Sequence, residues 1–198
     1  MWLRREFHRL AALPAGHNAM SEFNPRENYF ALLAVPQSYE VSQSDLTRSY
    51  RELQREAHPD RFAGASEREH LRAVQHSSQI NEAYETLISP TRRAAYLLKL
   101  AGVDSDMSST TFQDPEFLMQ QMQLREELSE LQDAKDPEAA LDAFYRDLEA
   151  AATKQKAIFS TSYTQKQFDE ALASYAKLQF LEKLRSEAEL KESELLDY

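Results

Sequence analysis

Cysteine is absent from this sequence of 198 residues, and glycine occurs only three times. Without cysteine the chain has no disulfide framework, no thiolate metal site and no cysteine nucleophile, which is compatible with a reducing compartment. No apolar run approaches the length of a membrane span, and no run of alternating β-branched residues stands out. The abundant residues are leucine, alanine, glutamate, glutamine and arginine, all good helix formers. The composition therefore predicts an all-α protein without a membrane partner.

The net charge of −10 is unevenly distributed along the chain. Residues 1–19 carry +2, residues 20–103 carry −1, and residues 104–198, with 10 basic and 21 acidic residues, carry −11. An acidic half of this kind repels nucleic acid and anionic membranes. The charge distribution thus argues against nucleic acid as a partner.

Helix starts are marked by capping residues that are followed by proline or by an acid three positions later. The predicted N-caps are Asn24, Ser42, Ser66, Ser89, Asp114 and Asp136, and a last long helix is predicted to open at Thr164. The first of these helices is expected to end near Ala34 and the third at Ser89, and Gly102 closes the fourth.

These starts divide the chain into two expected units. Residues 22–103 form a small four-helix unit, residues 104–111 are a polar linker, and residues 112–198 form an antiparallel three-helix bundle. Residues 1–21 are expected to be a disordered extension. The arginine-rich first 19 residues also fit a targeting peptide, or an upstream start codon chosen in place of Met20.

The second helix ends at His58-Pro59-Asp60, because proline stops a helical pattern. Its buried stripe is predicted to consist of Leu46, Tyr50, Leu53 and Ala57. Away from this stripe, Arg48 and Arg55 fall within about 20° of each other around the axis and Arg51 about 60° from Arg48. The three arginines form either a solvated charged face or a docking face for an acidic partner, since guanidinium suits carboxylates.

His58 and Asp60 carry the polar groups of this turn. An acid–base pair or a metal site is weighed low, because flanking residues on a tight loop tend to point apart and no third ligand lies nearby in sequence. His70 and His76 are about 240° apart around their helix and cannot bind one ion together. No metal site, cofactor or catalytic residue is therefore predicted.

The segment HPDRF, with the arginine-bearing helix before it and INEAYETLISPTRRAAY (Ile80–Tyr96) after it, resembles a J-domain over about residues 28–96. Arg61 stands where lysine is commoner in that family. The resemblance implies docking on a DnaK-class ATPase chaperone and stimulation of its ATP hydrolysis. It assigns the essential tip to His58, Pro59 and Asp60 and the electrostatic face to Arg48, Arg51 and Arg55. The chain would then have no catalysis of its own.

The helix that follows Asp114 has two different faces. Phe117, Gln121, Leu124, Leu128 and Leu131 lie within about 40° of one line and form the predicted core stripe. Leu118, Met119 and Met122 lie off this line, followed on the same side by Glu126 and Glu130. These apolar residues are either a wide stripe covered by another element or an exposed partner site, which two adaptable methionines favour.

The segments ENYFALLAVP, FLMQQMQLREELSEL and AKLQFLEKLRSEAELKESELLDY resemble the HscB/Jac1 family. That resemblance implies a bundle that binds an IscU-type iron–sulfur scaffold and delivers it to an HscA-type chaperone. Its matching scaffold contacts are Leu118, Met119, Met122, Gln123, Glu126, Glu130 and Phe180, with Gln123 in place of the usual acid.

The absence of a cysteine-rich N-terminal segment favours a bacterial cytoplasmic protein or a fungal-type mitochondrial one. The alternative functions are a J-protein with another client and, much less favoured, an enzyme that uses His58 and Asp60.

Overall fold

The computed structural model describes residue 24 and residues 27–104 and 114–196, and within these ranges the regular structure is entirely helical. The predicted extension (1–21) and nearly all of the predicted linker (104–111) lie outside the described residues. The elements in chain order are α1 (Tyr29–Leu32), α2 (Gln43–Ala57), the 3₁₀ helix η1 (Pro59–Phe62), α3 (Glu67–Ile88), α4 (Pro90–Leu100), α5 (Pro115–Glu130), the 3₁₀ helix η2 (Leu131–Asp133), α6 (Pro137–Thr164) and α7 (Phe168–Leu196).

Most helices begin where their capping residues predict. The Ser66 hydroxyl accepts from the amide of Glu69 while the Glu69 carboxylate accepts from the amide of Ser66, which completes a capping box. The hydrogen bond that the Ser66 hydroxyl donates to the Glu69 carboxylate, followed by that from the Ser66 amide, lowers the pKa of Glu69. Asp114 and Asp136 accept hydrogen bonds from amides in the first turns of α5 and α6, each with proline next in sequence. These predicted starts are confirmed.

Two predicted helix starts are wrong. Helix α1 is capped by Asn28, whose side chain accepts from the amide of Phe30, and it is much shorter than a helix running from Asn24 to Ala34. Thr164 is the last residue of α6, and α7 begins at Phe168. The Thr164 hydroxyl donates to the carbonyl of Ser160, the bond a threonine makes inside a helix rather than as its cap.

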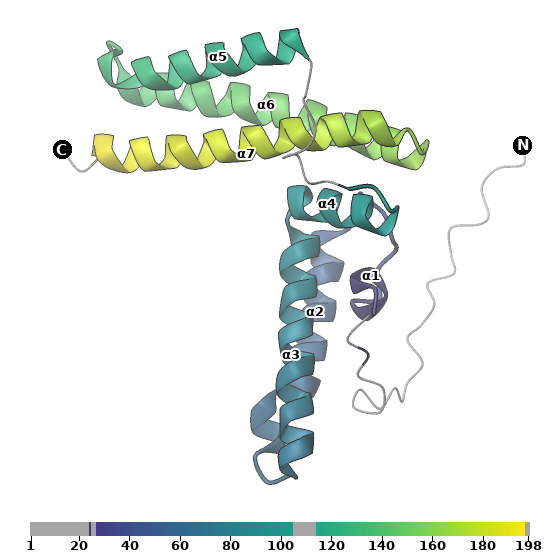
Figure 1. Ribbon diagram of the computed structural model, residues 1–198. Coiled ribbons are helices and arrows are strands. Elements are labelled where there is room, and N and C mark those ends of the chain that lie inside the picture. Colours follow the sequence, from purple (N-terminus) through teal and green to yellow (C-terminus); the bar gives the residue numbers. More distant parts are fainter. Residues whose placement is uncertain (1–23, 25–26, 105–113, 197–198) are drawn as a thin grey trace, which may run out of the picture.

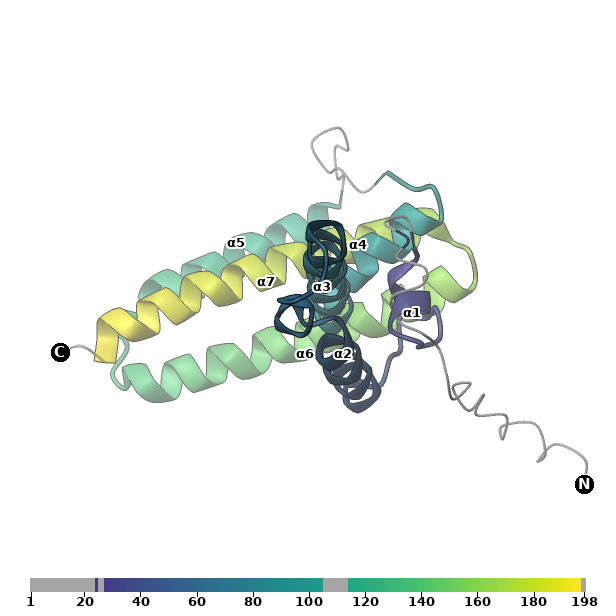
Figure 2. The ribbon, with the colours of Figure 1, turned by 90° about the horizontal axis from the view of Figure 1, so that it is seen from below.

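The helices are arranged as a hairpin joined crosswise to a bundle (Figure 1). Helices α5, α6 and α7 lie side by side as the predicted antiparallel three-helix bundle, whereas the α2–α3 hairpin projects away from it (Figures 1 and 2). Helix α4 lies between the two parts, against α7. No helix among the described residues is long and apolar enough to cross a membrane.

The buried side chains form two clusters. One fills the distal part of the bundle and includes Leu124, Leu128 and Leu184. The other joins α1–α4 to the bundle, because it contains Phe159 of α6 and Tyr175 of α7 together with residues of the first four helices. The hairpin and the bundle therefore share one core.

The shared core has specific contacts at the junction. The ring of Tyr39, from the segment between α1 and α2, lies 4.7 Å from that of Phe159, centroid to centroid. The Tyr163 hydroxyl donates to the carbonyl of Leu97 in α4 over 3.2 Å. The buried guanidinium of Arg93 lies 5.2 Å from the Tyr39 ring centroid. The junction is thus a packed interface that fixes the direction of the hairpin.

Candidate docking surfaces

The His-Pro-Asp turn forms the tip of the hairpin. His58 ends α2 and caps η1, and its Nδ1 accepts a hydrogen bond of 3.3 Å from the amide of Asp60. Its Nδ1 also lies 3.7 Å from the Asp60 carboxylate. The expectation that the two side chains point apart is therefore wrong, because the 3₁₀ turn that starts at Pro59 folds residue 60 back over residue 58.

Both polar side chains of the tip are accessible to a partner. The exposed fraction is 55% for the His58 side chain and 91% for that of Asp60. Among the described residues no group of three or more His, Asp and Glu side chains is arranged to hold a metal ion.

A basic face runs along α2 behind the tip. Arg48, Arg51 and Arg55 are all exposed and line a shallow, open depression on the side of α2 away from buried Leu46 and Ala57, as predicted. An Arg61 guanidinium nitrogen donates to the carbonyl of Arg55 over 3.1 Å, which satisfies a carbonyl at the end of α2. The structure therefore brings the three arginines together on one surface next to the tip.

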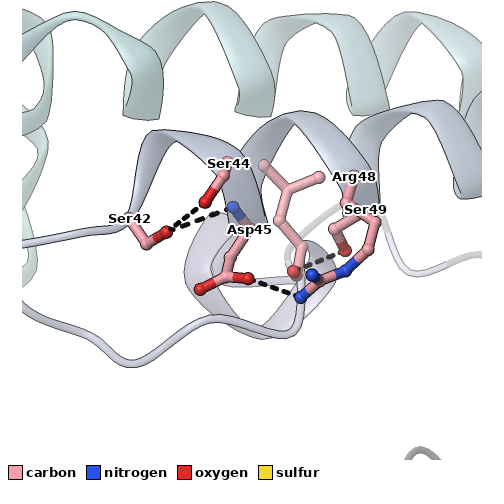
Figure 3. A network of polar contacts seen from close by, with 6 residues as sticks. Ser42, Ser44, Asp45, Arg48 and Ser49 are labelled. Carbon is pink, nitrogen blue, oxygen red and sulfur yellow. Dashed lines mark hydrogen bonds and ion pairs between the residues drawn. The ribbon is translucent and has the colours of Figure 1, made fainter.

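One member of the basic face already has a carboxylate partner (Figure 3). The guanidinium of Arg48 lies 2.5 Å from Asp45, one turn earlier, and the Asp45 amide donates to the capping hydroxyl of Ser42. Ser49, on the same helix, donates to the carbonyl of Leu33 and so ties α2 to the end of α1. The ion pair was not predicted, although its i, i+3 spacing is a signal for it.

Polar contacts fix how α2 and α3 lie against each other. The Tyr50 hydroxyl donates to Asn81 over 3.0 Å, and the Gln54 amide donates to the carbonyl of Ser77 over 3.2 Å. The rings of Tyr50 and Tyr84 stack with centroids 4.2 Å apart. These contacts, which sequence reasoning missed, hold the basic face and the tip in one geometry.

An apolar patch, consisting of Leu118, Met119 and Met122, lies on the outer face of α5. The exposed fractions are 58%, 72% and 66%, respectively. On the opposite face Phe117 and Leu124 are buried, 4% and 7% exposed. The predicted division of this helix into a core stripe and an exposed apolar face is confirmed.

Polar residues continue the patch along the helix. Glu126 and Glu130 are exposed, and the Gln123 amide donates to the carboxylate of Glu127 over 3.0 Å. Phe180 of α7 is half-buried: its ring lies edge-on to that of Phe117, 5.6 Å away, and 5.7 Å from the Arg125 guanidinium. Phe180 therefore lies at the edge of the bundle core, next to Phe117 and Arg125 of α5.

The start of α5 is held to α7 by an ion pair that the sequence reasoning missed. The Lys177 ammonium lies 2.7 Å from the Asp114 carboxylate and 5.1 Å from the Phe117 ring centroid. The hydrogen bond from Lys177, followed by that from the amide of Phe117, lowers the pKa of Asp114. The capping residue of α5 thus also anchors the apolar patch to the bundle.

The family comparisons divide the chain in the same way as the geometry. Residues 28–96 match the family described as the DnaJ domain, and residues 113–189 match the family described as the HSCB C-terminal oligomerisation domain. A hairpin with an exposed His-Pro-Asp tip and a basic face, joined to a separate helical domain, defines a J-domain co-chaperone, which acts with a DnaK-class chaperone. The chain belongs to the HscB family.

Relatives of known name are similar over most of their length. The co-chaperone protein HscB homolog of Photobacterium profundum is 44% identical over 144 residues, 73% of this chain and 84% of that protein. The homolog of Aliivibrio salmonicida is 43% identical over 169 residues, 85% of this chain and 99% of that protein. These relatives are named as co-chaperones, not as enzymes.

Two solved structures have the same fold. The chaperone HscB from Vibrio cholerae superposes with a TM-score of 0.77 at 43% identity, covering 85% of this chain and 99% of that one. The human co-chaperone protein HscB superposes with a TM-score of 0.79 at 31% identity, covering 85% of this chain and 84% of that one.

Proposed function

We propose that this chain binds an IscU-type iron–sulfur scaffold, delivers it to an HscA-type, DnaK-class ATPase chaperone and stimulates that chaperone's ATP hydrolysis during iron–sulfur cluster maturation. The observation that carries the proposal is the presence of two separate exposed surfaces, the tip with its basic face and the apolar patch of α5, on one molecule with a shared core. Membership of the HscB family supports the same assignment.

The chaperone-docking surface in this proposal consists of the tip (His58, Pro59 and Asp60) and the basic face (Arg48, Arg51 and Arg55). The planar guanidinium groups suit carboxylates on an acidic partner. The exposed tip side chains then reach the partner without any rearrangement of the core. Only the partner hydrolyses ATP, so this chain acts as an adaptor and activator.

The scaffold-binding surface in this proposal is centred on the apolar patch of α5. An exposed cluster of three large apolar side chains is typical of a protein interface, and methionine adapts its shape to a partner. The complete proposed set is Leu118, Met119, Met122, Gln123, Glu126, Glu130 and Phe180. The iron–sulfur cluster is cargo of the scaffold in this scheme, since the chain supplies no cysteine.

The division of labour follows the proposed domain boundaries. Residues 22–103 would act on the chaperone and residues 112–198 on the client, with 104–111 joining them. We place the protein in the bacterial cytoplasm, because the curated relatives named above are bacterial.

The test is the rate of ATP hydrolysis by the HscA-type chaperone with this protein alone, with the IscU-type scaffold alone and with both. We expect stimulation by this protein and a further increase with the scaffold. Stimulation without that increase would assign the protein to another client, and a pull-down from the native lysate would then identify it. A chaperone rate that this protein leaves unchanged would contradict the proposal.

A further inference from the structure

A second pair of exposed apolar side chains lies on α3. The exposed fraction is 56% for Leu71 and 42% for Val74. Elsewhere in the described ranges, outside the apolar patch of α5, the large apolar residues that are exposed are Leu100 and Leu190, one each on α4 and α7. Single exposed apolar residues are normal on a protein surface. A pair separated by three positions forms a continuous apolar spot on one side of a helix.

The register of the hairpin places this pair next to the tip. Tyr50 of α2 bonds Asn81 of α3, and four residues further along α2, Gln54 bonds Ser77, four residues earlier in α3. Because both helices rise by the same distance per residue, another four-residue step brings His58 level with position 73. Val74 and Leu71 therefore lie in the turn of α3 that is level with the tip.

The pair also lies on the same side of the hairpin as the basic face. Residues three apart on a helix differ by about 60° in direction. On α3, each step of three residues back from the buried Ile80 turns the side-chain direction by this angle. The first step leads to Ser77, which contacts α2, and the next two lead to Val74 and Leu71. On α2, the buried residues face the core, Gln54 faces α3, and the arginines point further around the axis, away from the core. The arginines of α2 and the Leu71 and Val74 pair of α3 therefore lie on the same face of the hairpin, the face turned away from the core.

We infer that Leu71 and Val74 form the apolar part of the chaperone-docking surface, where they contact an apolar area of the DnaK-class ATPase beside the acidic surface that the arginines bind. This inference rests on the proposed function and adds a second type of contact to it. Charged contacts are screened by salt and guide the approach. Apolar contacts are not screened, and they supply binding that remains at high salt.

The experiment compares the wild type with the double variant Leu71→Ala plus Val74→Ala, with Leu190→Ala as the control for losing an exposed apolar side chain far from the tip. The half-maximal concentration for stimulating the chaperone's ATPase is measured at several salt concentrations. We expect the double variant to need about tenfold more protein at every salt concentration, a change of about 1.4 kcal/mol. The slope against salt should be that of the wild type, and the control should behave as wild type.

Each other outcome has a definite meaning. A double variant with the wild-type half-maximal concentration would overturn the inference while leaving the proposed function intact. A wild type that does not stimulate would overturn both. A wild type that self-associates in analytical ultracentrifugation, and a double variant that does not, would assign the pair to a second copy and overturn the inference. If the double variant melts at a lower temperature than the wild type, the measurement is repeated with Leu71→Gln, because glutamine is a good helix former of similar length.

Discussion

Replacing Leu118, Met119 and Met122 together with alanine tests whether these side chains form a binding face or part of the core. The side chains are 58%, 72% and 66% exposed, so truncation removes mainly atoms that already contact water. Surface substitutions of this kind usually change the free energy of unfolding by less than about 0.5 kcal/mol each. Alanine is also the best helix former, so the local stability of α5 should not fall.

Truncating the core face of the same helix gives the contrast. Leu124 and Leu128 are only 7% and 6% exposed, and alanine at either position should cost about 2–5 kcal/mol. For a protein of this size, each kcal/mol corresponds to about 2–4 °C in Tm. The triple variant should therefore melt close to the wild type, whereas Leu124→Ala should melt clearly lower.

Scaffold binding should respond in the opposite way from stability, with the large loss in the triple variant. Central apolar anchors of an interface cost about 2 kcal/mol or more when truncated, close to a thirtyfold loss of affinity for each. Titration of the IscU-type scaffold by calorimetry should show a large increase in Kd for the triple variant. Stimulation of the chaperone by the variant alone should persist, and the additional stimulation by the scaffold should disappear.

The result that refutes this reasoning is a triple variant that binds the scaffold as the wild type does. A large fall in Tm would be equally damaging, because it would mean that these side chains stabilise the bundle. Leu190→Ala, which removes a side chain that is 68% exposed on α7, is the matched control for losing apolar surface elsewhere.

Three further predictions concern the tip, the basic face and the start of α5. His58→Gln should keep the far-ultraviolet circular dichroism and Tm of the wild type and abolish stimulation of the chaperone's ATPase; normal stimulation would contradict the role of the tip. Arg48→Glu with Arg55→Glu should weaken chaperone docking but not scaffold binding, and wild-type docking should fade as salt screens charges beyond about 8 Å. Asp114→Asn should be less stable than the wild type at neutral pH. Because the pKa of Asp114 is held below its ordinary value of 3.8 in the folded protein, its stabilisation is complete above that value and is lost as the pH falls through the folded pKa. The difference in Tm between the two proteins should therefore shrink in acid, and a constant difference would exclude the ion pair as its cause; Asp136→Asn at the start of α6 is the control.

Local chemistry made much of the fold predictable. The capping box of Ser66 and Glu69 forms within three residues, so the sequence pattern contains both partners. The exposure of Met119 could be predicted from the turn of 100° per residue in an α-helix, because Phe117 marks the buried side of the same helix. Thr164 shows the limit of such patterns, since its hydroxyl bonds a carbonyl of its own helix instead of capping the next one.

Contacts between distant segments were not predictable from local patterns. Tyr39 lies in an irregular segment without hydrophobic periodicity, yet it is 4% exposed and packs on Phe159, far along the chain. The pairing of Lys177 with Asp114 also depends on how α7 lies against α5. Helical spacing predicted the exposure of Leu118, Met119 and Met122, whereas the family resemblance suggested which partner they would bind.

The core shared by the hairpin and the bundle has a consequence for how two partners meet. When two binding modules are joined by a flexible linker, the effective concentration of one partner at the other depends on linker length. Here the contact between Tyr39 and Phe159 holds the segment between α1 and α2 against α6, and the bond from Tyr163 to Leu97 holds α4 against the bundle. If the proposed function holds, a client bound on α5 would be presented to a docked chaperone from a single direction. The meeting of client and chaperone would then depend on how the two surfaces are aligned and not on the length of a flexible linker.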